Sequence, residues 1–558
     1  MFNKNMEFIN NEALKSRLSE MKLEESRWDM SYCMTPTNDY LLMKNDVPID
    51  DINDPRGAIK DMLKKTIKSQ MGENDIIITF GFGLGYLLDE VFNTYPSKIF
   101  VYEPDIKLLH FVLNMVDISE HLASGRVFIT NDLNELLDKL SEVYITKDKV
   151  EVVYLKNYAV VKSQELLELS QKVYETCKSK TVDVNTIARF SETWLVNTIK
   201  NINTINSGDF YKLSDLEGKF FGQTALILAA GPSLAENFEK IKANREKYVI
   251  FAVNKVLRTV LANGITPDFV VGLDAEYISA TMAGLEEYLP KMSYITDLRA
   301  DNYGLTSGFK KTLVSFASND AVIKNLADYN KFMKLYECGG SSTTMAFISA
   351  VKMGFEKIVF SGLDLAFKDN VMYANGETIK RVSEEKIAIN DVEKTLTKVK
   401  SVTGKEVLTR DDYAAFIKHF ETLIKDSGYT EIYNTTSFGA DIEGMRNVPF
   451  DNISLLNTSN TTAILLGELS PFKLETKDWA QEELFKINSV IENLSKGEFS
   501  PALMSSIVKA SVLYQYMQAD VLKVLQSKAN EELIGEFITK TKNSVKNVID
   551  LLQRNRLI

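Results

Sequence analysis

The sequence predicts a multidomain α/β protein in which two parallel-sheet units precede an all-helical C-terminal region. Short apolar runs alternate with helical patterns over much of the chain, which predicts strands joined by crossover helices. Two strand-to-helix junctions, at 81–85 and 231–233, contain glycine. After Pro471, apolar residues recur only at helical spacings. A chain of 558 residues has room for about three to four domains, and we expect boundaries at 1–205, 206–465 and 466–558.

The first α/β unit centres on the glycine turn Gly81-Phe82-Gly83-Leu84-Gly85, which follows the apolar run Asp75–Phe80. A second run, Ile99–Tyr102, ends beside Glu103. This arrangement resembles the opening of methyltransferase-like Rossmann units, in which such an acid holds a ribose. The turn is shorter than the dinucleotide-binding fingerprint, and close packing of a helix on a strand also explains its glycines. We favour packing, and interpret the residues before Asp75 as a helical cap on a Rossmann-like accessory domain.

The most informative stretch is Thr224–Asn237, where an apolar run breaks at Gly231-Pro232-Ser233 and leads directly into a helical pattern. Glycine lets the backbone approach a ligand, Ser233 stands where an N-cap belongs, and Glu236 completes the pattern of a capping box. Free N–H groups and the positive end of the helix dipole would then attract an anion. A plain strand-to-helix turn with a capping serine is the alternative.

Further strands of the central domain end in polar side chains. The apolar runs Lys247–Asn254, Phe269–Asp274, Lys357–Phe360 and Glu431–Asn434 all do so or lead into such residues. Alternating strands and helices predict a doubly wound sheet, which binds ligands beyond the carboxyl ends of its strands. The sequence therefore predicts a nucleotide-sized site there, formed by Asn254, Asp274, Gly362, Asp364, Asn434 and Thr435 with the second helix start Gly339, Gly340, Ser341 and Ser342.

Residue types restrict the chemistry of this site. The chain has 3 histidines, and the sequence contains neither an HExxH motif nor a paired-cysteine motif, so we expect no metal site. We interpret His419 as a boundary residue of a helix. A general base would then be a carboxylate, and Asp274, Glu276 and Asp364 are the candidates. Each of them could equally accept a hydrogen bond from a sugar hydroxyl, so both roles stay open.

Six motifs, in order, carry a family resemblance: AAGPSL, AVN, ITPDFVVGLD, GGSSTTMAF, FSGLDLAF with YANGE, and YNTTSFGADIEG. Together they resemble the motility-associated factor (Maf) glycosyltransferases. The central domain of that family is shared with archaeal 6-hydroxymethylpterin diphosphokinases and is similar to bacterial sialyltransferases. The resemblance covers Phe221 to Phe450 in detail and the whole chain in domain order. It implies a sialyltransferase-like central domain at 206–465.

The resemblance also implies an activity. Such enzymes transfer a nonulosonic acid, of the pseudaminic or legionaminic type, from its CMP-activated form to Ser or Thr hydroxyls of flagellin, without a further cofactor. The nucleotide and donor would be held by Gly231, Pro232, Ser233, Asn254, Gly339, Gly340, Ser341, Ser342, Gly362, Asn434 and Thr435. The catalytic candidates are Asp274, Glu276, Asp364 and Tyr373, and the last of these stands where histidine is expected in some relatives.

Composition fits a large soluble protein and says little more. A net charge of −11 disfavours nucleic acid. The sequence has no apolar run of the ~18 residues that a membrane span needs, and the start MFNKNMEFIN lacks a signal-peptide core, so we expect a cytoplasmic protein without a membrane span. Cys33, Cys177 and Cys338 are widely spaced and are interpreted as free thiols.

The C-terminal region predicts a helical bundle over 466–558. Helical patterns cover Lys477–Leu494, Pro501–Ser527 and Glu531–Leu557, with Ser500 as a cap before Pro501. The predicted core residues are Leu503, Ile507, Val512, Tyr516 and Val521. A face for docking flagellin or for forming a homo-oligomer is the alternative interpretation of the same stripe.

Three functions of different classes therefore compete. The first is a metal-independent glycosyltransferase that uses a CMP-activated acidic sugar and flagellin. The second is a pterin diphosphokinase-like enzyme that uses ATP and magnesium, against which the three-part chain and the long helical tail argue. The third is a non-catalytic flagellin-binding factor with the same fold.

Overall fold

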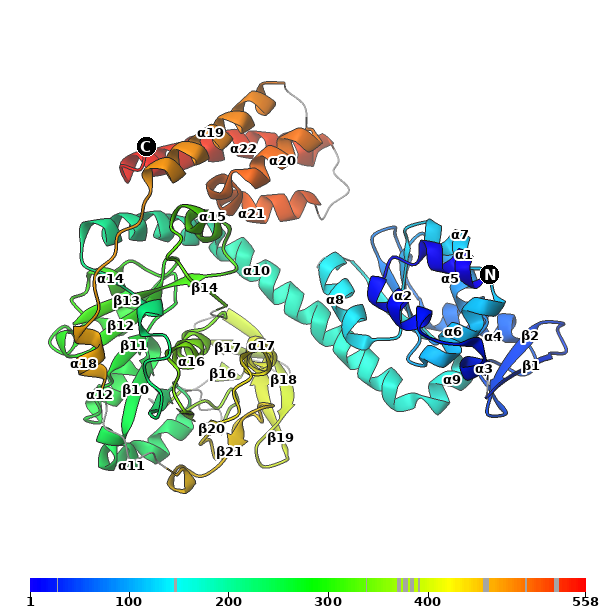
Figure 1. Cartoon of the computed structure of the whole chain (residues 1–558), viewed down its shortest axis with the longest axis horizontal. Coiled ribbons are helices and arrows are strands. Elements are labelled where there is room, and N and C mark those ends of the chain that lie inside the picture. The colour runs from blue at the N-terminus through cyan, green and yellow to red at the C-terminus, as the bar shows by residue number, and fades with distance from the viewer. Residues whose placement is uncertain are drawn as a thin grey trace. The chain divides into compact units, whose positions relative to one another are not determined.

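The chain folds into two compact units, Met1–Val184 and Asn185–Ile558. The computed structural model describes residues 1–27, 29–144, 148–337, 339–368, 373–374, 380–381, 386–389, 392–454, 461–496, 499–525 and 531–558. The boundary predicted at 205 lies inside helix α10 (Ser163–Ser207), which begins in unit 1 and ends in unit 2 (Figure 1). The helices after 466 belong to unit 2.

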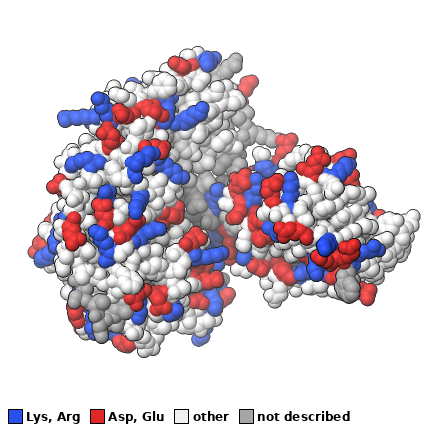
Figure 2. All heavy atoms as spheres, viewed as in Figure 1, with Lys and Arg blue, Asp and Glu red and all other residues white. Residues whose placement is uncertain are grey.

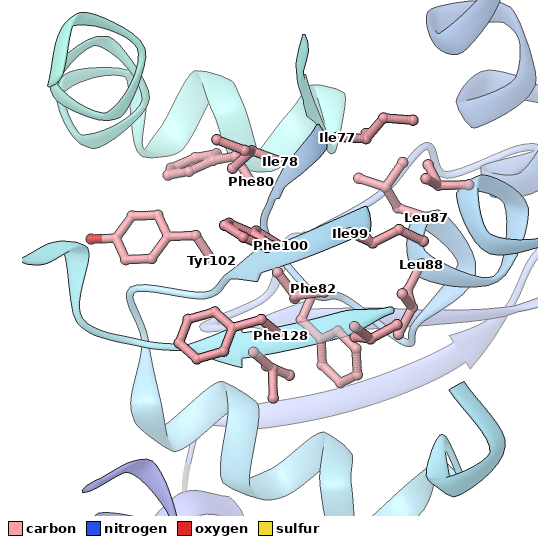
Figure 3. Packing of buried hydrophobic residues seen from close by; sticks show 14 of the residues in the cluster. Ile77, Ile78, Phe80, Phe82, Leu87, Leu88, Ile99, Phe100, Tyr102 and Phe128 are labelled. Carbon is pink, nitrogen blue, oxygen red and sulfur yellow. The ribbon is translucent and has the colours of Figure 1, made fainter. Parts of the chain in front are cut away.

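Unit 1 is built on a four-stranded parallel sheet with the order β6-β5-β4-β7. Strands β4 (Ile76–Phe80) and β5 (Lys98–Tyr102) confirm the two predicted runs. Large apolar side chains of β4, of β5 and of the helix that follows β4 pack into one core (Figure 3). The other elements of unit 1 are α1 (Phe2–Phe8), α2 (Glu12–Ser19), α3 (Leu23–Arg27), β1 (Met30–Met34), β2 (Tyr40–Lys44), β3 (Val47–Pro48), α4 (Pro55–Thr66), α5 (Tyr86–Thr94), α6 (Ile106–Met115), α7 (Ser119–Ala123), β6 (Val127–Thr130), α8 (Leu133–Val143), β7 (Val150–Tyr154) and α9 (Lys156–Val161).

The predicted helical cap is only part of what precedes Asp75. Helices α1 to α4 do lie there, but the chain also forms an antiparallel sheet, β1-β2-β3, that the sequence reading omitted. The turn at Asp54 starts helix α4, because the Asp54 side chain accepts a hydrogen bond from the Gly57 amide and Pro55 occupies the first helical turn.

Unit 2 contains a ten-stranded sheet with the order β14-β13-β12-β11-β10-β9-β15-β20-β21, and β8 pairs with β13. All its pairings are parallel. The strands are β8 (Tyr211–Lys212), β9 (Thr224–Leu228), β10 (Tyr248–Val253), β11 (Phe269–Val271), β12 (Ser293–Asp297), β13 (Lys311–Ala317), β14 (Leu335–Tyr336), β15 (Lys357–Ser361), β20 (Ile432–Asn434) and β21 (Arg446–Asn447). The five predicted strands are confirmed as β9, β10, β11, β15 and β20.

Side chains of β9 alternate between two cores, as a doubly wound sheet requires. Ala225 and Ile227 join the core that contains the buried residues of α16 (Ser342–Met353). Leu226 and Leu228 join the core formed with α11 (Phe238–Ala243) and α12 (Leu257–Ala262). Strand β9 pairs with β10 on one side and with β15 on the other, so the strand order changes direction at β9. The α/β multidomain class is therefore confirmed.

The segment between β15 and α17 (Asp411–Ser427) adds an antiparallel sheet that the sequence did not predict. Its strands are β16 (Lys380–Arg381), β17 (Lys386–Ile389), β18 (Val392–Lys400) and β19 (Glu406–Arg410). Helix α17 contains His419, for which the sequence predicted a helix, and its buried residues include Phe420 and Leu423. The shorter helices of unit 2 are α13 (Ile278–Met282), α14 (Tyr303–Thr306), α15 (Ala321–Tyr329) and α18 (Thr462–Gly467).

The C-terminal helices α19 (Lys477–Ser495), α20 (Pro501–Lys509), α21 (Ser511–Leu525) and α22 (Glu531–Arg554) pack together and against α15 (Figure 1). Ser500 caps α20 as predicted. The single helix predicted over Pro501–Ser527 is wrong, because the chain leaves the helical conformation at Ala510 and starts a new helix. Four of the five predicted core residues are buried, whereas Tyr516 is half-buried and its hydroxyl donates a hydrogen bond to Glu192.

Candidate functional site

A cleft of about 250 Å³ lies at the carboxyl edge of the large sheet, where the strand order changes direction at β9. Loops after β9, β10, β11 and β15 form one part of its wall, and the first residues of α16 and the side of α17 form the rest. The lining residues are Ala229, Ala230, Gly231, Val253, Asn254, Lys255, Asp274, Gly340, Ser341, Ser342, Thr343, Gly362, Leu363, Asp364, Leu365, Ala366, Tyr373, Tyr413, Phe416 and Phe420. The sequence therefore located the cleft correctly.

The N-terminus of α16 provides an anion site in this wall. Ser341 caps the helix: its hydroxyl accepts from the Thr344 amide, and the Thr344 hydroxyl accepts from the Ser341 amide, both at 3.1 Å. Among the described residues, the amides of Gly340, Ser342 and Thr343 have no hydrogen-bond acceptor. These three amides lie where the helix dipole is positive and line the cleft, so they can bind a phosphate oxygen.

The Gly231 turn is built differently from the prediction. Ser233 is not an N-cap, because a 3-10 helix, η2 (Pro232–Asn237), begins right after Gly231 and has no side-chain cap. The predicted capping box is likewise wrong: the Glu236 carboxylate accepts instead from Lys368 and Ser437. Two backbone amides of this turn donate to acceptors within the protein. Gly231 N–H donates to the Gly362 carbonyl at 2.8 Å, and Ser233 N–H donates to Asp364 Oδ2 at 2.8 Å.

Asp364 is the partner that closes this turn. Its carboxylate is buried and also accepts from the Ser233 hydroxyl at 2.5 Å and from the Thr436 side chain. Burial raises the pKa of Asp364, while the bonds from Ser233 and Thr436 lower it. Gly231 is required here, because a Cβ would lie 2.5 Å from Asp364 Oδ2. Asp364 thus ties the loops after β9, β15 and β20 together, and Ser233 faces that carboxylate instead of the cleft.

Asp274 is the carboxylate that the cleft exposes. Asn254 Nδ2 donates to Asp274 Oδ2 at 3.0 Å, and the Ser342 hydroxyl donates to Asn254 Oδ1 at 3.2 Å. The same hydroxyl accepts from the Leu273 amide at 3.1 Å. Asn254 is buried, whereas Asp274 is exposed. A chain of hydrogen bonds therefore fixes an exposed carboxylate relative to the first residue of α16.

Of the predicted site residues not yet described, Tyr373 lies in the cleft wall, whereas the others lie outside it. Tyr373 reaches the cleft wall, where the Lys255 ammonium lies 4.7 Å from its ring centre. Glu276 is half-buried and is not part of the wall. Asn434 and Thr435 are buried and serve the fold: Asn434 Nδ2 donates to the Leu363 carbonyl at 2.9 Å, and the Thr435 hydroxyl donates to the Phe360 carbonyl at 2.9 Å. Pro232 and Gly339 lie just outside the wall.

Sequence reasoning missed Lys255 and an aromatic wall made of Tyr413, Phe416 and Phe420. Lys255 directly follows the predicted strand-end Asn254, and the aromatic residues recur at helical spacing along α17. The Arg410 guanidinium stacks 3.9 Å from the ring centre of Tyr413. Burial raises the pKa of Tyr413, whose hydroxyl is hydrogen-bonded to Tyr373. The cleft thus combines an anion site, a carboxylate and an apolar wall, which suits a nucleotide-linked substrate.

The glycine turn of unit 1 is occupied by the protein's own side chains. A Cβ on Gly81 would lie 2.6 Å from Tyr158 Cδ1, so the turn packs directly against that ring. The buried Glu103 carboxylate accepts from the Phe82 and Asp105 amides, each at 2.9 Å, and from the Tyr158 hydroxyl. Burial raises the pKa of Glu103 to about 7. Gly81 therefore serves close packing, and the Glu103 carboxylate stabilises the glycine turn from within the protein.

Four further observations concern metal ions, membranes, surface charge and cysteines. Among the described residues, no three His, Cys, Asp or Glu side chains gather as metal ligands would. None of the helices so described is both long and apolar enough to cross a bilayer. Acidic and basic side chains are intermixed on the face shown in Figure 2. Cys33 and Cys177 are free thiols, and Cys338 lies outside the described residues.

Fold and cleft together define a doubly wound α/β protein with a cleft at the carboxyl edge of its large sheet, and comparisons with known proteins show which proteins it is similar to. Residues 196–370 match the family described as 6-hydroxymethylpterin diphosphokinase MptE-like. The solved structure of a Maf glycosyltransferase from Magnetospirillum magneticum AMB-1 is similar with a TM-score of 0.67, at 14% identity, over 100% of this chain and 96% of that chain. The resemblance to Maf proteins is therefore confirmed in the fold, along the whole chain.

A curated relative adds a local match. A protein of Treponema pallidum (strain Nichols), described as uncharacterized, is 29% identical over 116 residues. The aligned part is 21% of this chain and 52% of that protein, so the chain spans about half the length of this relative.

Proposed function

We propose that this chain is a glycosyltransferase that moves a nonulosonic acid, of the pseudaminic or legionaminic type, from its CMP-activated form to Ser or Thr hydroxyls of flagellin in the cytoplasm. The observation that carries the proposal is the exposed Asp274 carboxylate, joined through Asn254 to the side chain of Ser342, whose backbone amide lies at the start of α16. The whole-chain likeness in fold to a Maf glycosyltransferase supports glycosyl transfer. The six sequence motifs support the nonulosonic acid and the flagellin acceptor.

Donor binding follows from the wall of the cleft. The single phosphate of a CMP-sugar would accept hydrogen bonds from the amides of Gly340, Ser342 and Thr343. Lys255, which is exposed and lines the cleft, adds positive charge to its wall. The aromatic wall of Tyr413, Phe416 and Phe420 offers apolar surface for the sugar or the base.

The transfer step needs one bond to form and one to break. The acceptor hydroxyl oxygen attacks the anomeric carbon, and the bond from that carbon to the phosphate oxygen breaks with its electron pair left on CMP. The α16 amides meet the charge that grows on the leaving phosphate. Asp274 orients the acceptor hydroxyl and takes its proton. We expect no cofactor beyond the activated donor to take part.

A pterin diphosphokinase-like activity is the second candidate, because the matched family carries that description. Such an enzyme transfers a diphosphate from ATP and needs magnesium to bridge phosphate oxygens. A mononucleotide donor that leaves as CMP has no such need. The two proposals therefore differ in the nucleotide that binds and in the dependence of turnover on a metal.

We expect CMP, in EDTA, to raise the thermal unfolding midpoint more than equal concentrations of UDP or ATP, because a ligand that binds the native state stabilises it. The same panel is repeated with magnesium, because ATP binds many proteins as its magnesium complex.

Transfer from the CMP donor to flagellin, scored by intact mass, should survive excess EDTA. A shift with magnesium and ATP alone would favour the diphosphokinase. Transfer that stops in EDTA and returns with magnesium would make Asp274 and Glu276 metal ligands.

The α16 anion site can be tested with two substitutions at one position. Ser342 is the first residue of α16 and follows an extended Ser341, so proline fits there without disturbing the helix. Ser342→Pro and Ser342→Ala both lose the hydroxyl, but only proline also loses the amide N–H. We expect the Kd for CMP, measured by calorimetric titration, to rise about tenfold more for Ser342→Pro than for Ser342→Ala. Equal affinities for the two variants would remove this amide from the phosphate site.

A further inference from the structure

Two buried asparagines of helix α10 hold the loops that carry the candidate site. Asn197 and Asn201 are one helical turn apart and therefore share a face of α10. They are 9% and 0% exposed. Asn197 Nδ2 donates to the Ala275 carbonyl at 2.8 Å and to the Arg299 carbonyl at 3.0 Å. Asn201 Nδ2 donates to the Leu298 and Ala300 carbonyls, each at 2.8 Å.

The loop around Asp274 is therefore fixed on both sides. The Asp274 carbonyl accepts from the Asp301 amide at 2.9 Å, and the next carbonyl along the chain, that of Ala275, accepts from Asn197. Asn201 holds the turn to which Asp301 belongs. Because Ala275 separates Asp274 from Glu276 in the sequence, Asn197 restrains the peptide between the two candidate acids.

The restraint continues from the backbone into the site. Asp274 binds Asn254, and Asn254 binds Ser342 at the start of α16, with bonds of 3.0 and 3.2 Å. A connected path thus runs from α10 by a hydrogen bond to Ala275, along the backbone to Asp274, and by two further hydrogen bonds to the Ser342 side chain at the start of α16. Its first link lies outside the cleft wall.

We infer that Asn197 is a positioning residue for transfer, which sets the place of the Asp274 carboxylate relative to the phosphate site of α16. This inference rests on the proposed function. Loss of the Asn197 amide removes the hydrogen bonds that it donates to the Ala275 and Arg299 carbonyls, so the loop after β11 keeps the Asp301 bond but loses this second restraint and can shift. A shift of about 1 Å in a reacting group costs about a hundredfold in rate.

A matched control lies on the same helix. Asn206 Nδ2 donates to the Leu474 carbonyl at 3.0 Å, and Asn206 Oδ1 accepts from the Leu474 amide at 2.8 Å. Asn206→Ala therefore removes the same side chain and two hydrogen bonds from α10 without contacting the Asp274 loop. Asn197→Ser keeps one donor in place of two and serves as a milder variant at the test position.

The experiment is a double-mutant cycle on the full chain, read as kcat for transfer. We expect Asn197→Ala to lower kcat at least about tenfold in the native background and less than about twofold in an Asp274→Asn background. CMP affinity should change less than about threefold, because the α16 amides stay in place. Asn197→Ser should lie between wild type and Asn197→Ala, and Asn206→Ala should match wild type. An equal loss of kcat in both backgrounds, or a loss as large in Asn206→Ala, would overturn the inference.

Hydrogen exchange gives a readout that is independent of the proposed reaction. The Asp301 amide, which donates to the Asp274 carbonyl, should exchange faster in Asn197→Ala and at the wild-type rate in Asn206→Ala. If the wild-type chain transfers no sugar, the proposed function fails, and exchange still decides whether Asn197 holds this loop. Unchanged exchange at Asp301 in Asn197→Ala would reject the positioning role.

Discussion

Asp274→Asn should lower the rate of transfer at least about tenfold and leave the thermal unfolding midpoint unchanged. The substitution keeps the shape of the side chain and an oxygen that can accept from Asn254 Nδ2. It removes only the charge and the basicity that the acceptor hydroxyl would use. Because Asp274 is exposed, little folding energy depends on its ionisation. Turnover and the unfolding midpoint should be measured on the same preparation.

The control for this variant is Glu239→Gln, which neutralises an exposed acid of α11 whose contact is the neighbouring Lys242. Its rate should equal that of wild type. Glu276→Gln distinguishes the two acids after β11. A larger loss of rate in Glu276→Gln than in Asp274→Asn would assign the general base to Glu276, which lies outside the cleft wall. Activity near wild type in Asp274→Asn would exclude Asp274 from the reaction.

The location of the site could be predicted from the sequence because it depends on a few local rules. Apolar runs of strand length alternate with helices, so the strands are parallel and their carboxyl ends share one edge. Polar residues at the ends of such runs, Asn254 and Asp274, therefore had to lie close together. The capping pattern at Ser341 has the same local origin, since the bonds that form it connect residues three apart.

The role of Ser233 could not be predicted in the same way. Its partner is Asp364, 131 residues further along the chain, and only the pairing of β9 with β15 brings the two together. A serine two residues after a glycine looks the same in sequence whether it caps a helix or binds a buried carboxylate. Asn434 was misread for a related reason: a polar strand end can face the crevice or bond the neighbouring loop, here at the Leu363 carbonyl.

The role of the two asparagines of α10 could not be predicted from the sequence. Asn197 and Asn201 stand in a helical pattern without a motif, and their acceptors are carbonyls that any sequence provides. Lys255 and the aromatic residues of α17 carried a weak signal, namely their helical spacing and the strand end beside them. Helical spacing and a neighbouring strand end are as typical of a packed core as of a cleft wall. Only the fold shows that these residues line the cleft.

Asp364→Asn should destabilise unit 2 by about 2–3 kcal/mol, a large fraction of the stability of a typical domain. The carboxylate accepts from both the amide and the hydroxyl of Ser233, on different oxygens. Asparagine keeps one oxygen for the Ser233 amide but replaces the other with an NH2 group, so the Ser233 hydroxyl must change from donor to acceptor and both bonds lose the negative charge of the carboxylate. The loss should appear as a lower urea midpoint of the tryptophan fluorescence, to which Trp479, fully buried in unit 2, contributes as one of the 3 tryptophans of the chain.

Ser233→Ala provides the test of this mechanism, because it removes the hydroxyl that Asp364 binds. In the native background it should cost about 1–2 kcal/mol, and in the Asp364→Asn background clearly less, since the two side chains act as a pair. Asp274→Asn should leave the urea midpoint where it is and so controls for the loss of a nearby acid. If Asp364→Asn unfolds at the wild-type urea concentration yet loses transfer, the buried carboxylate belongs to the reaction and its structural role is refuted.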